Sequence, residues 1–195
     1  MIFVGHPHEK GEVMSEHVMI DLETLGTGND AVIISLGAVK FNPVADTLRE
    51  GFYVRISPES CVAHGLKIDG QTVTWWLQAD RADARQALLA SEEMDLASAL
   101  DGFAIWFGLE SRPVWGNGAT FDNVILRNAY RAARMDCPWE FWHDRCFRTF
   151  KSLAPNLPKP TFDAADVQHH ALGDARAQAR QMQLIVKQLK LGGVK

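Results

Sequence analysis

The stretch His17-Val-Met-Ile-Asp-Leu-Glu23 predicts a short apolar β-strand that carries two acids. Asp21 and Glu23 are two positions apart, so both side chains leave the same face of a sheet and Leu22 points to the other face. Two acids on one face are unusual for a core strand. Two explanations stay open at this point: the face is solvated, as in many edge strands, or the acids carry chemistry.

Further strands and helices extend outward from this strand. Turn signals at residues 26–30 and 42–43 separate it from strand candidates at 31–41 and 47–56, and such short connections imply antiparallel neighbours. The pattern predicts an α/β domain with a mixed central sheet flanked by helices. The other predicted elements are a strand at 112–116 and helices at 72–78, 81–90, 94–109, 119–134, 146–153 and 171–190.

Composition and length favour one globular domain. The chain has 195 residues, of which 47% are hydrophobic and 23% charged, enough for a sizeable core. No apolar run reaches the roughly 18 residues that a membrane span needs, and the first ten residues lack a secretory signal pattern. The three cysteines form no CxxC pair, which argues against disulfides and a zinc site. We expect a cytoplasmic protein with one domain at 17–190, a lead at 1–16 that is disordered or an ordered addition, and a tail at 191–195.

The charge is unevenly distributed along the chain. The net charge is −4, but residues 127–159 contain seven Lys or Arg and three Asp or Glu, a local charge of +4. A basic face of this kind can bind phosphates while the whole chain stays acidic. A solvated helix face explains the same pattern equally well.

The stretch Trp115-Gly-Asn-Gly-Ala-Thr-Phe-Asp122 places a third acid where an apolar strand ends and a helix begins. Catalytic groups favour the ends of strands, where loops and helix N-termini converge. An acid in the first helical turn also suits the helix dipole. That electrostatic explanation accounts for Asp122 as well as catalysis does.

The stretch Gln168-His-His-Ala-Leu-Gly-Asp174 adds a fourth acid and two histidines. His170 and Asp174 are four apart and would share a face of a continuous helix. His169 and Asp174 are five apart and would meet only if His169 lies on the loop before the helix. Local capping of the helix is the alternative role for the histidines. An apolar stripe puts Asp174 at the margin of the core, and its members are Leu172, Ala175, Ala179, Met182, Val186 and Leu189.

Four carboxylates gathered against a core need a counter-charge, because a buried unpaired charge costs several kcal/mol. A pair of divalent metal ions is the simplest counter-charge, and such pairs are a standard means of attacking phosphodiesters. Hard oxygen ligands suit Mg²⁺ or Mn²⁺. The residues therefore predict a metal-dependent nuclease.

The three clusters follow the patterns Asp-x-Glu-Thr-x-Gly (Asp21 to Gly26), Asn-x-x-x-Phe-Asp (Asn117 to Asp122) and His-x-Ala-Leu-x-Asp (His169 to Asp174). In this order they resemble the motifs of the DEDDh family, the 3′→5′ exonuclease superfamily of RNase T, oligoribonuclease and the proofreading subunit of bacterial DNA polymerase III. The stretch Thr74-Trp-Trp-Leu-Gln78 also resembles a phage and bacterial subgroup, which includes phage exodeoxyribonuclease A and a mycobacterial 3′→5′ exoribonuclease.

The resemblance implies a ribonuclease H-like fold and two Mg²⁺ or Mn²⁺ ions. It implies that His169, not His170, is the general base that takes a proton from the attacking water. The expected activity is release of nucleoside 5′-monophosphates from the 3′ ends of single-stranded DNA or RNA. The metal ligands that it implies are Asp21, Glu23, Asp122 and Asp174.

Four candidates for binding the terminal nucleotide lie near the first motif and in the Trp-Trp stretch. By the resemblance, Leu25 would wedge against the terminal base, and the backbone N–H of Thr24 would bind the terminal ribose. Trp75 and Trp76 lie about 100° apart on a helix, so one can pack inside while the other faces a groove. Stacking of a base on an aromatic ring contributes about 1–3 kcal/mol. Core packing is the alternative role for each tryptophan.

Two further candidates belong to the second motif, and two more lie between it and the third motif. Phe121 points toward the same terminal nucleotide, with core packing as the alternative. Asn117 would fix the turn before Asp122. Arg145 and Arg148 are candidates for phosphate contact, and a solvated surface position is the alternative for both.

Two other classes of function are weighed against an active exonuclease. A catalytically idle nucleic-acid-binding module could keep the fold, but the intact acids and histidine argue against it. An exonuclease subunit of a replication or repair complex is the other alternative. Related exonucleases often form homodimers, so a homodimer is also an expectation, and no membrane association is expected.

Overall fold

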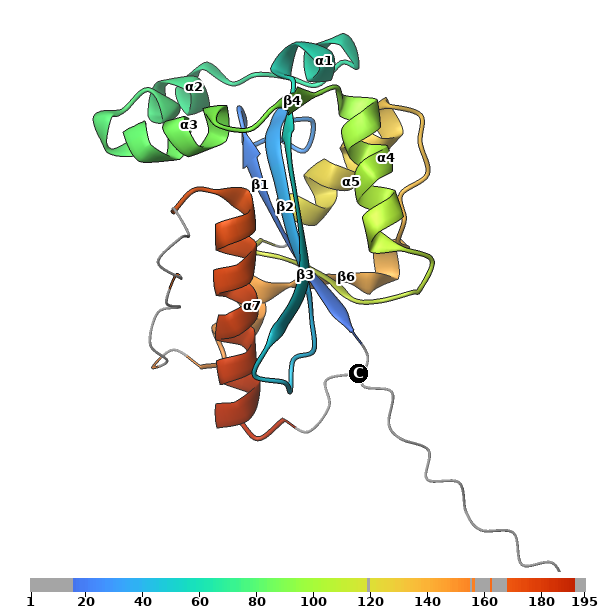
Figure 1. Ribbon diagram of the computed structural model, residues 1–195, viewed down its shortest axis with the longest axis vertical. Coiled ribbons are helices and arrows are strands. Elements are labelled where there is room, and N and C mark those ends of the chain that lie inside the picture. Colours follow the sequence, from blue (N-terminus) through green and yellow to red (C-terminus); the bar gives the residue numbers. More distant parts are fainter. Residues whose placement is uncertain (1–15, 119, 155, 157–161, 163–167, 192–195) are drawn as a thin grey trace, which may run out of the picture.

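The computed structural model describes residues 16–118, 120–154, 156, 162 and 168–191. In this part of the chain, six strands form one sheet in the order β4-β3-β2-β1-β5-β6, with helices on both faces (Figure 1). The expected lead at 1–16 lies outside the described residues except for Glu16, and so does the expected tail except for residue 191. The strands are β1 (His17–Thr24), β2 (Ile33–Phe41), β3 (Leu48–Ile56), β4 (Glu93–Met94), β5 (Val114–Gly116) and β6 (Asp144–Cys146).

The sheet is mixed, as the sequence predicted. β1, β2 and β3 are antiparallel neighbours, whereas β5 is parallel to β1, β6 to β5 and β4 to β3. β1 therefore has a hydrogen-bonded strand on each side, which excludes the edge-strand explanation for its two acids. The short strands β4 and β6 were not predicted, because two or three residues are too few for an alternating pattern to show.

The helices start where the sequence supplies caps. The carboxylate of Asp69 accepts the N–H of Gln71, so α2 begins two residues before the predicted helix at 72–78. The six-residue α1, capped by Ser57 with Pro58 at its first position, was not predicted. In the described part of the chain, no helix combines the length and the apolar character that crossing a bilayer requires. The helices are α1 (Pro58–Ala63), α2 (Gly70–Trp76), α3 (Ala82–Leu89), α4 (Leu96–Phe107), α5 (Asp122–Ala132), α6 (Phe147–Lys151) and α7 (Ala171–Gln188), with 3-10 turns η1 (Ala79–Arg81) and η2 (Phe141–His143).

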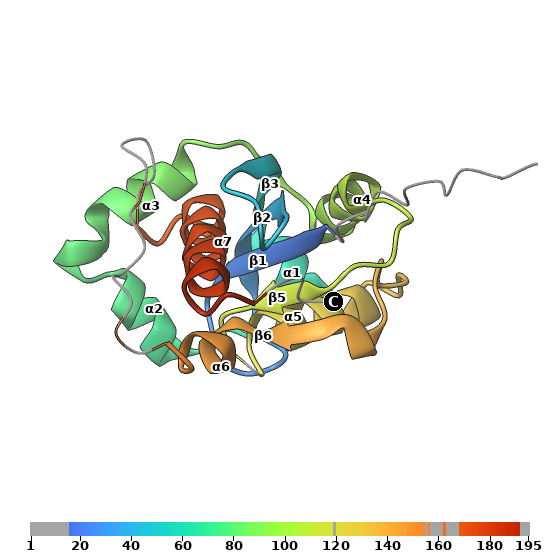
Figure 2. The same cartoon turned by 90° about the horizontal axis from the view of Figure 1, so that it is seen from below.

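The two faces of the sheet pack against different helices (Figure 2). Val18, Ile20 and Leu22 of β1 belong to the larger core, which α4 and α5 cover. Met19, two residues before Asp21, belongs to the smaller core, which α6 and α7 cover. Because side chains alternate along a strand, Asp21 and Glu23 lie on the α7 face.

Gly37 lets the start of α7 approach the sheet. It pairs with Asp21 across β1 and β2. A Cβ atom at this position would overlap the backbone of Ala171 and Leu172, so α7 crosses β2 in backbone contact. This contact puts the first turn of α7 directly over the strand position next to Asp21.

Gly116 has the same role for α5. A Cβ atom at this last residue of β5 would lie 2.8 Å from the Cβ of Asp122 and would overlap the side-chain oxygen of Asn123. The first turn of α5 therefore packs closely on the end of β5. In this way two glycines bring two helix N-termini to the acids of β1.

We expect Gly37→Ala to lower the free energy of unfolding by about 1–3 kcal/mol, because the added methyl group would have to displace the backbone of α7. Thermal unfolding followed by circular dichroism measures this loss. Gly70→Ala is the matched control, since a Cβ there meets nothing within 4 Å. A Gly37→Ala variant that melts with or above the wild type would contradict the backbone contact.

Candidate active site

Four carboxylates from three segments converge at the end of β1. Asp21 and Glu23 come from β1, Asp122 from the first turn of α5 and Asp174 from the first turn of α7. Burial raises the pKa of Asp21 most, and the charges of Asp122, Glu23 and Asp174 raise it further. Each of the other three acids therefore acts electrostatically on Asp21.

The cluster is unfavourable for four negative charges. Burial, followed by the charges of Asp174 and Asp122, raises the pKa of Glu23 to about 8. Burial also raises the pKa of Asp122 to about 6, although three backbone N–H groups and Arg148 oppose the shift. A bound divalent cation would reverse these shifts, and oxygen ligands of this kind suit such an ion. The donor set therefore fits a metal site.

Hydrogen bonds hold two of the acids in place. Asp122 accepts the backbone N–H of Leu22 at 3.1 Å and that of Asn117 at 2.7 Å, so it joins β1 to the loop after β5. The side-chain amide of Gln178 donates to Asp21 at 2.8 Å. No sequence motif includes Gln178, although its spacing of four from Asp174 places both on one face of α7.

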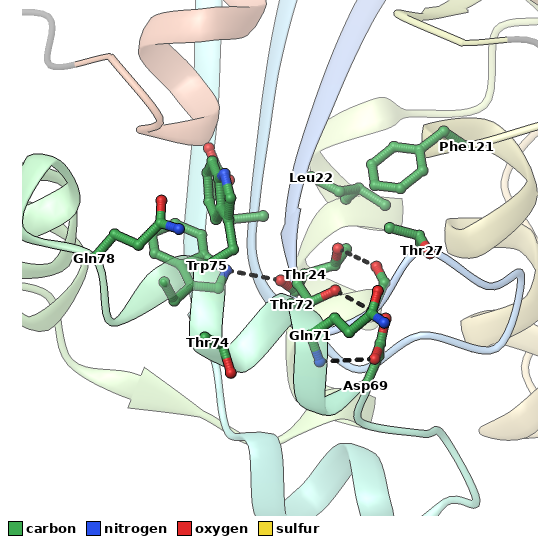
Figure 3. A pocket seen from close by; sticks show the side chains of 13 residues that line it. Leu22, Thr24, Thr27, Asp69, Gln71, Thr72, Thr74, Trp75, Gln78 and Phe121 are labelled. Carbon is green, nitrogen blue, oxygen red and sulfur yellow. Dashed lines mark hydrogen bonds between the residues drawn. The ribbon is translucent and has the colours of Figure 1, made fainter.

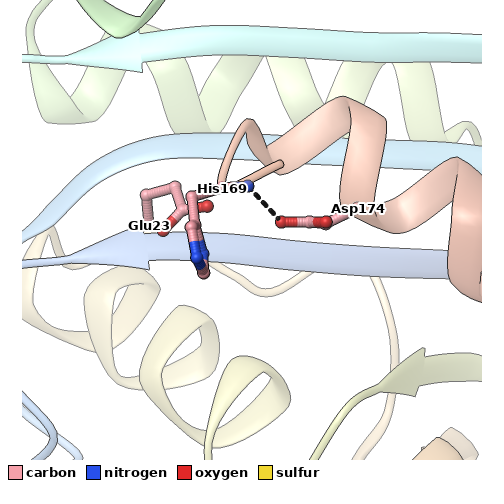
Figure 4. Close-up of side chains that lie close together, drawn as sticks. All are labelled: Glu23, His169 and Asp174. Carbon is pink, nitrogen blue, oxygen red and sulfur yellow. Dashed lines mark hydrogen bonds between the residues drawn. The ribbon is translucent and has the colours of Figure 1, made fainter. Parts of the chain in front are cut away.

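His169, not His170, joins the acidic cluster (Figure 4). His169 lies on the loop before α7 with φ of +62°, and its backbone N–H donates to Asp174 at 3.0 Å. One ligand atom each of Glu23, His169 and Asp174 lie within 4.8 Å of one another. His170 is the N-cap residue of α7 without a side-chain capping bond, and its ring stacks on Tyr53 at 4.3 Å.

The surroundings of His169 favour its neutral form. Partial burial and then the charge of Arg81 lower its pKa, and Asp80 opposes this shift. The ring of Trp75 meets the imidazole edge to face, with 5.2 Å between ring centroids. A neutral imidazole can accept a proton, so the environment suits a base.

A cavity of about 680 Å³ opens beside Glu23. Trp75 and Phe121 lie on its two sides (Figure 3). Its lining is otherwise rich in hydroxyl and amide groups. Most of these groups were not predicted, because those on α2 belong to no recognisable motif. The lining residues are Leu22, Glu23, Thr24, Gly26, Thr27, Asp69, Gln71, Thr72, Thr74, Trp75, Trp76, Gln78 and Phe121.

The two tryptophans of α2 have different environments. Trp75 is partly exposed, and the guanidinium of Arg81 lies 4.3 Å from the centre of its ring. Trp76 is only 5% exposed, and its indole N–H donates to the backbone oxygen of Thr24 at 2.9 Å. Trp76 therefore supports the end of β1, and Trp75 presents its ring to the cavity.

The remaining substrate candidates differ in how they face the site. Leu25 lines a separate apolar pocket of about 220 Å³ against α3 and β3, not the cavity beside Glu23. Arg145 donates to the backbone oxygens of Trp142 and Asp144. Arg148 is exposed, and its charge acts on Asp122.

Comparison with known proteins adds a family and a fold. A family model described as a 3′-5′ exoribonuclease Rv2179c-like domain matches residues 16–186. The exodeoxyribonuclease of Enterobacteria phage T4 is 27% identical over 159 residues, which cover 67% of this chain and 68% of the phage protein.

The fold is shared with exonuclease I of E. coli. The zinc-bound complex of that enzyme with single-stranded DNA matches with a TM-score of 0.64 at 15% identity, and the complex with a dT13 oligonucleotide with 0.62 at 17%. Each match covers 91% of this chain but 42% of the exonuclease I chain, so this chain spans less than half the length of that enzyme. The likeness confirms the ribonuclease H-like α/β fold.

The melting temperature of the protein in EDTA is expected to fall as the pH rises from 6 to 8. Glu23 has a raised pKa of about 8 against an ordinary 4.5, so stability present at low pH is lost as the pH rises through 8. Glu23→Gln should flatten this decline, whereas Glu92→Gln at an exposed position should keep it. Mn²⁺ should raise the melting temperature more at pH 8 than at pH 6, because it binds the ionised cluster. Equal Mn²⁺ effects at both pH values would argue against a metal site here.

Proposed function

The chain belongs to the family of 3′-5′ exoribonuclease Rv2179c-like domains, and from this membership we propose that it releases nucleoside 5′-monophosphates from the 3′ ends of single-stranded RNA or DNA. The observation that carries the proposal is the convergence of four carboxylates and His169 beside a cavity with an aromatic wall. A cytoplasmic location and a homodimer remain predictions from the sequence.

Two divalent ions, Mg²⁺ or Mn²⁺, would be held by the four acids. When bound, they supply activation of the attacking water and neutralisation of charge at the cleaved phosphate. The bonds from Leu22 and Asn117 to Asp122, and from Gln178 to Asp21, fix the two carboxylates before any ion binds. Such fixed ligands support a defined coordination geometry.

His169 would take the proton from the attacking water. Its backbone bond to Asp174 fixes the loop, and its ring lies next to Glu23. Its lowered pKa keeps the imidazole neutral, and hence able to accept a proton, at neutral pH. Water gives its proton to the ring, and the resulting hydroxide attacks phosphorus as the P–O3′ bond breaks. The 3′ oxygen stays on the shortened strand and takes a proton from solvent, and the phosphate stays on the 5′ carbon of the released nucleotide.

The terminal nucleotide would occupy the cavity beside Glu23. The ring of Trp75 offers a stacking surface, and Phe121 offers an apolar wall on the other side. Trp76 and Thr24 would act as the floor, since each is nearly buried and they are joined by a hydrogen bond. Leu25 carries less support as a wedge, because it lines a different pocket.

Asp21→Asn and Asp174→Asn should abolish nucleotide release while the protein stays folded. His169→Ala should lower kcat by about 10²–10⁴-fold, the usual contribution of a general base. The assay compares matched RNA and DNA oligonucleotides, single- and double-stranded, labelled at the 5′ end, with Mg²⁺ and with Mn²⁺. Asp46→Asn, an exposed acid paired with Lys187, is the control and should keep full activity. Comparable rates for wild type and Asp21→Asn would refute the site.

Trp75→Ala should raise KM by roughly tenfold or more, because stacking on an aromatic ring contributes about 1–3 kcal/mol per base. Leu77→Ala changes the C-cap residue of the same helix, a side chain that is 70% exposed and does not line the cavity, and the KM of this variant should not change. Steady-state kinetics on a single-stranded oligonucleotide distinguishes the two variants. An unchanged KM in Trp75→Ala would remove the tryptophan from the substrate site.

A further inference from the structure

We propose that Arg148 and Lys151 of α6 form a cationic arm that binds the sugar-phosphate backbone of the single strand next to the cleaved bond. The inference rests on the proposed function and adds a strand-holding surface to it. The two residues are three positions apart on one short helix, so their side chains are neighbours. Within the residues that the structure describes, neither cation takes part in an ion pair.

Lys151 connects the arm to the acidic cluster. Its ammonium donates to the side-chain oxygen of Asn117 at 3.2 Å. The backbone N–H of the same asparagine donates to Asp122 at 2.7 Å. Partial burial, and then the charge of Arg148, lower the pKa of Lys151. Asn117 therefore links the Lys151 ammonium to the carboxylate of Asp122 through two hydrogen bonds.

Arg148 lies next to the wall of the cavity. One of its guanidinium nitrogens is 3.8 Å from the place where a Cβ would stand on Gly118, and the Cβ of Phe121 is 3.2 Å from the same place. Gly118 has no side chain to separate the guanidinium from the Cβ of Phe121. The charge of Arg148 also opposes, as the smallest contribution, the rise in the pKa of Asp122.

Other arginines of the basic segment are used inside the protein. Arg145 bonds to two backbone oxygens, and Arg127 donates to the backbone oxygen of Trp139 and pairs with Asp144. By contrast, the side chain of Arg148 is exposed and Lys151 is half-buried beside the site loop. The α6 pair is therefore better placed than Arg145 to meet a phosphate.

A cationic arm would reduce the repulsion between the acidic cluster and a nucleic-acid strand. A cluster of four acids repels a polyanionic strand, and ions bound between the acids offset that charge only at the cleaved phosphate. Cations beside the cluster attract the neighbouring phosphates without competing for the metal ligands. Phosphate contacts of this type add affinity that is independent of base sequence and falls with salt.

The test measures binding of a fluorescein-labelled single-stranded oligonucleotide by anisotropy in EDTA, between 50 and 200 mM salt. Arg148→Gln and Lys151→Gln should each weaken binding and reduce the slope of log K against log salt by about 0.7, the loss of one phosphate contact on a single strand. Lys151→Arg should keep the slope. Lys187→Gln removes the same charge from the far end of α7, where it pairs with Asp46, and should leave binding unchanged.

An unchanged slope in both α6 variants would overturn the arm. A fall in kcat at unchanged KM in Lys151→Gln would also overturn it, because Lys151 would then only support Asn117 and would not bind the strand. The anisotropy measurement does not need turnover. If the wild type shows the α6-dependent slope but releases no nucleotide with Mg²⁺ or Mn²⁺, the proposed function fails and the phosphate arm stands.

Discussion

The contact between the first turn of α7 and Gly37 is the constraint on which the candidate site depends. Gly37 pairs with Asp21, and the absence of a side chain there brings the α7 backbone onto the sheet. The same approach positions the loop that carries His169 and the turn that carries Asp174. If the helix stood off the sheet by the width of a methyl group, the third motif would no longer reach the first.

The acids of the site also destabilise the folded protein when they are ionised and no cation is bound. Asp21, Glu23 and Asp122 all have raised pKa values, chiefly because removal from water penalises their charged forms. A purely structural design would place apolar side chains at these positions, as β1 does with Met19 two residues earlier. Acids that destabilise the protein without a cation but would bind one tightly are typical of a functional site.

The side chains around the acids have two kinds of role, support of the acids and contact with the substrate. Trp76 and Gln178 are buried and bond to the end of β1 and to Asp21, so they support the site from behind. Trp75 presents its ring to the cavity, and the cations of α6 lie beside the loop of Asn117. The cavity thus has an aromatic side for bases, and by our proposal the cations of α6, which lie outside the cavity lining, bind the neighbouring phosphates.

The mixed sheet, the apolar stripe of the last helix and the three acidic motifs could be predicted from the sequence, because alternation and spacing are local properties. The family resemblance already implied His169 and not His170, and the fold gives the physical basis: a positive φ and a bond to Asp174 place one residue at the cluster, while the ring of the other stacks on Tyr53. Only the folded structure shows that Trp76 is buried and bonded to Thr24 whereas Trp75 is partly exposed at the cavity, and that Leu25 lines another pocket. Side-chain direction at such positions depends on partners that are distant in sequence, which no local pattern reports.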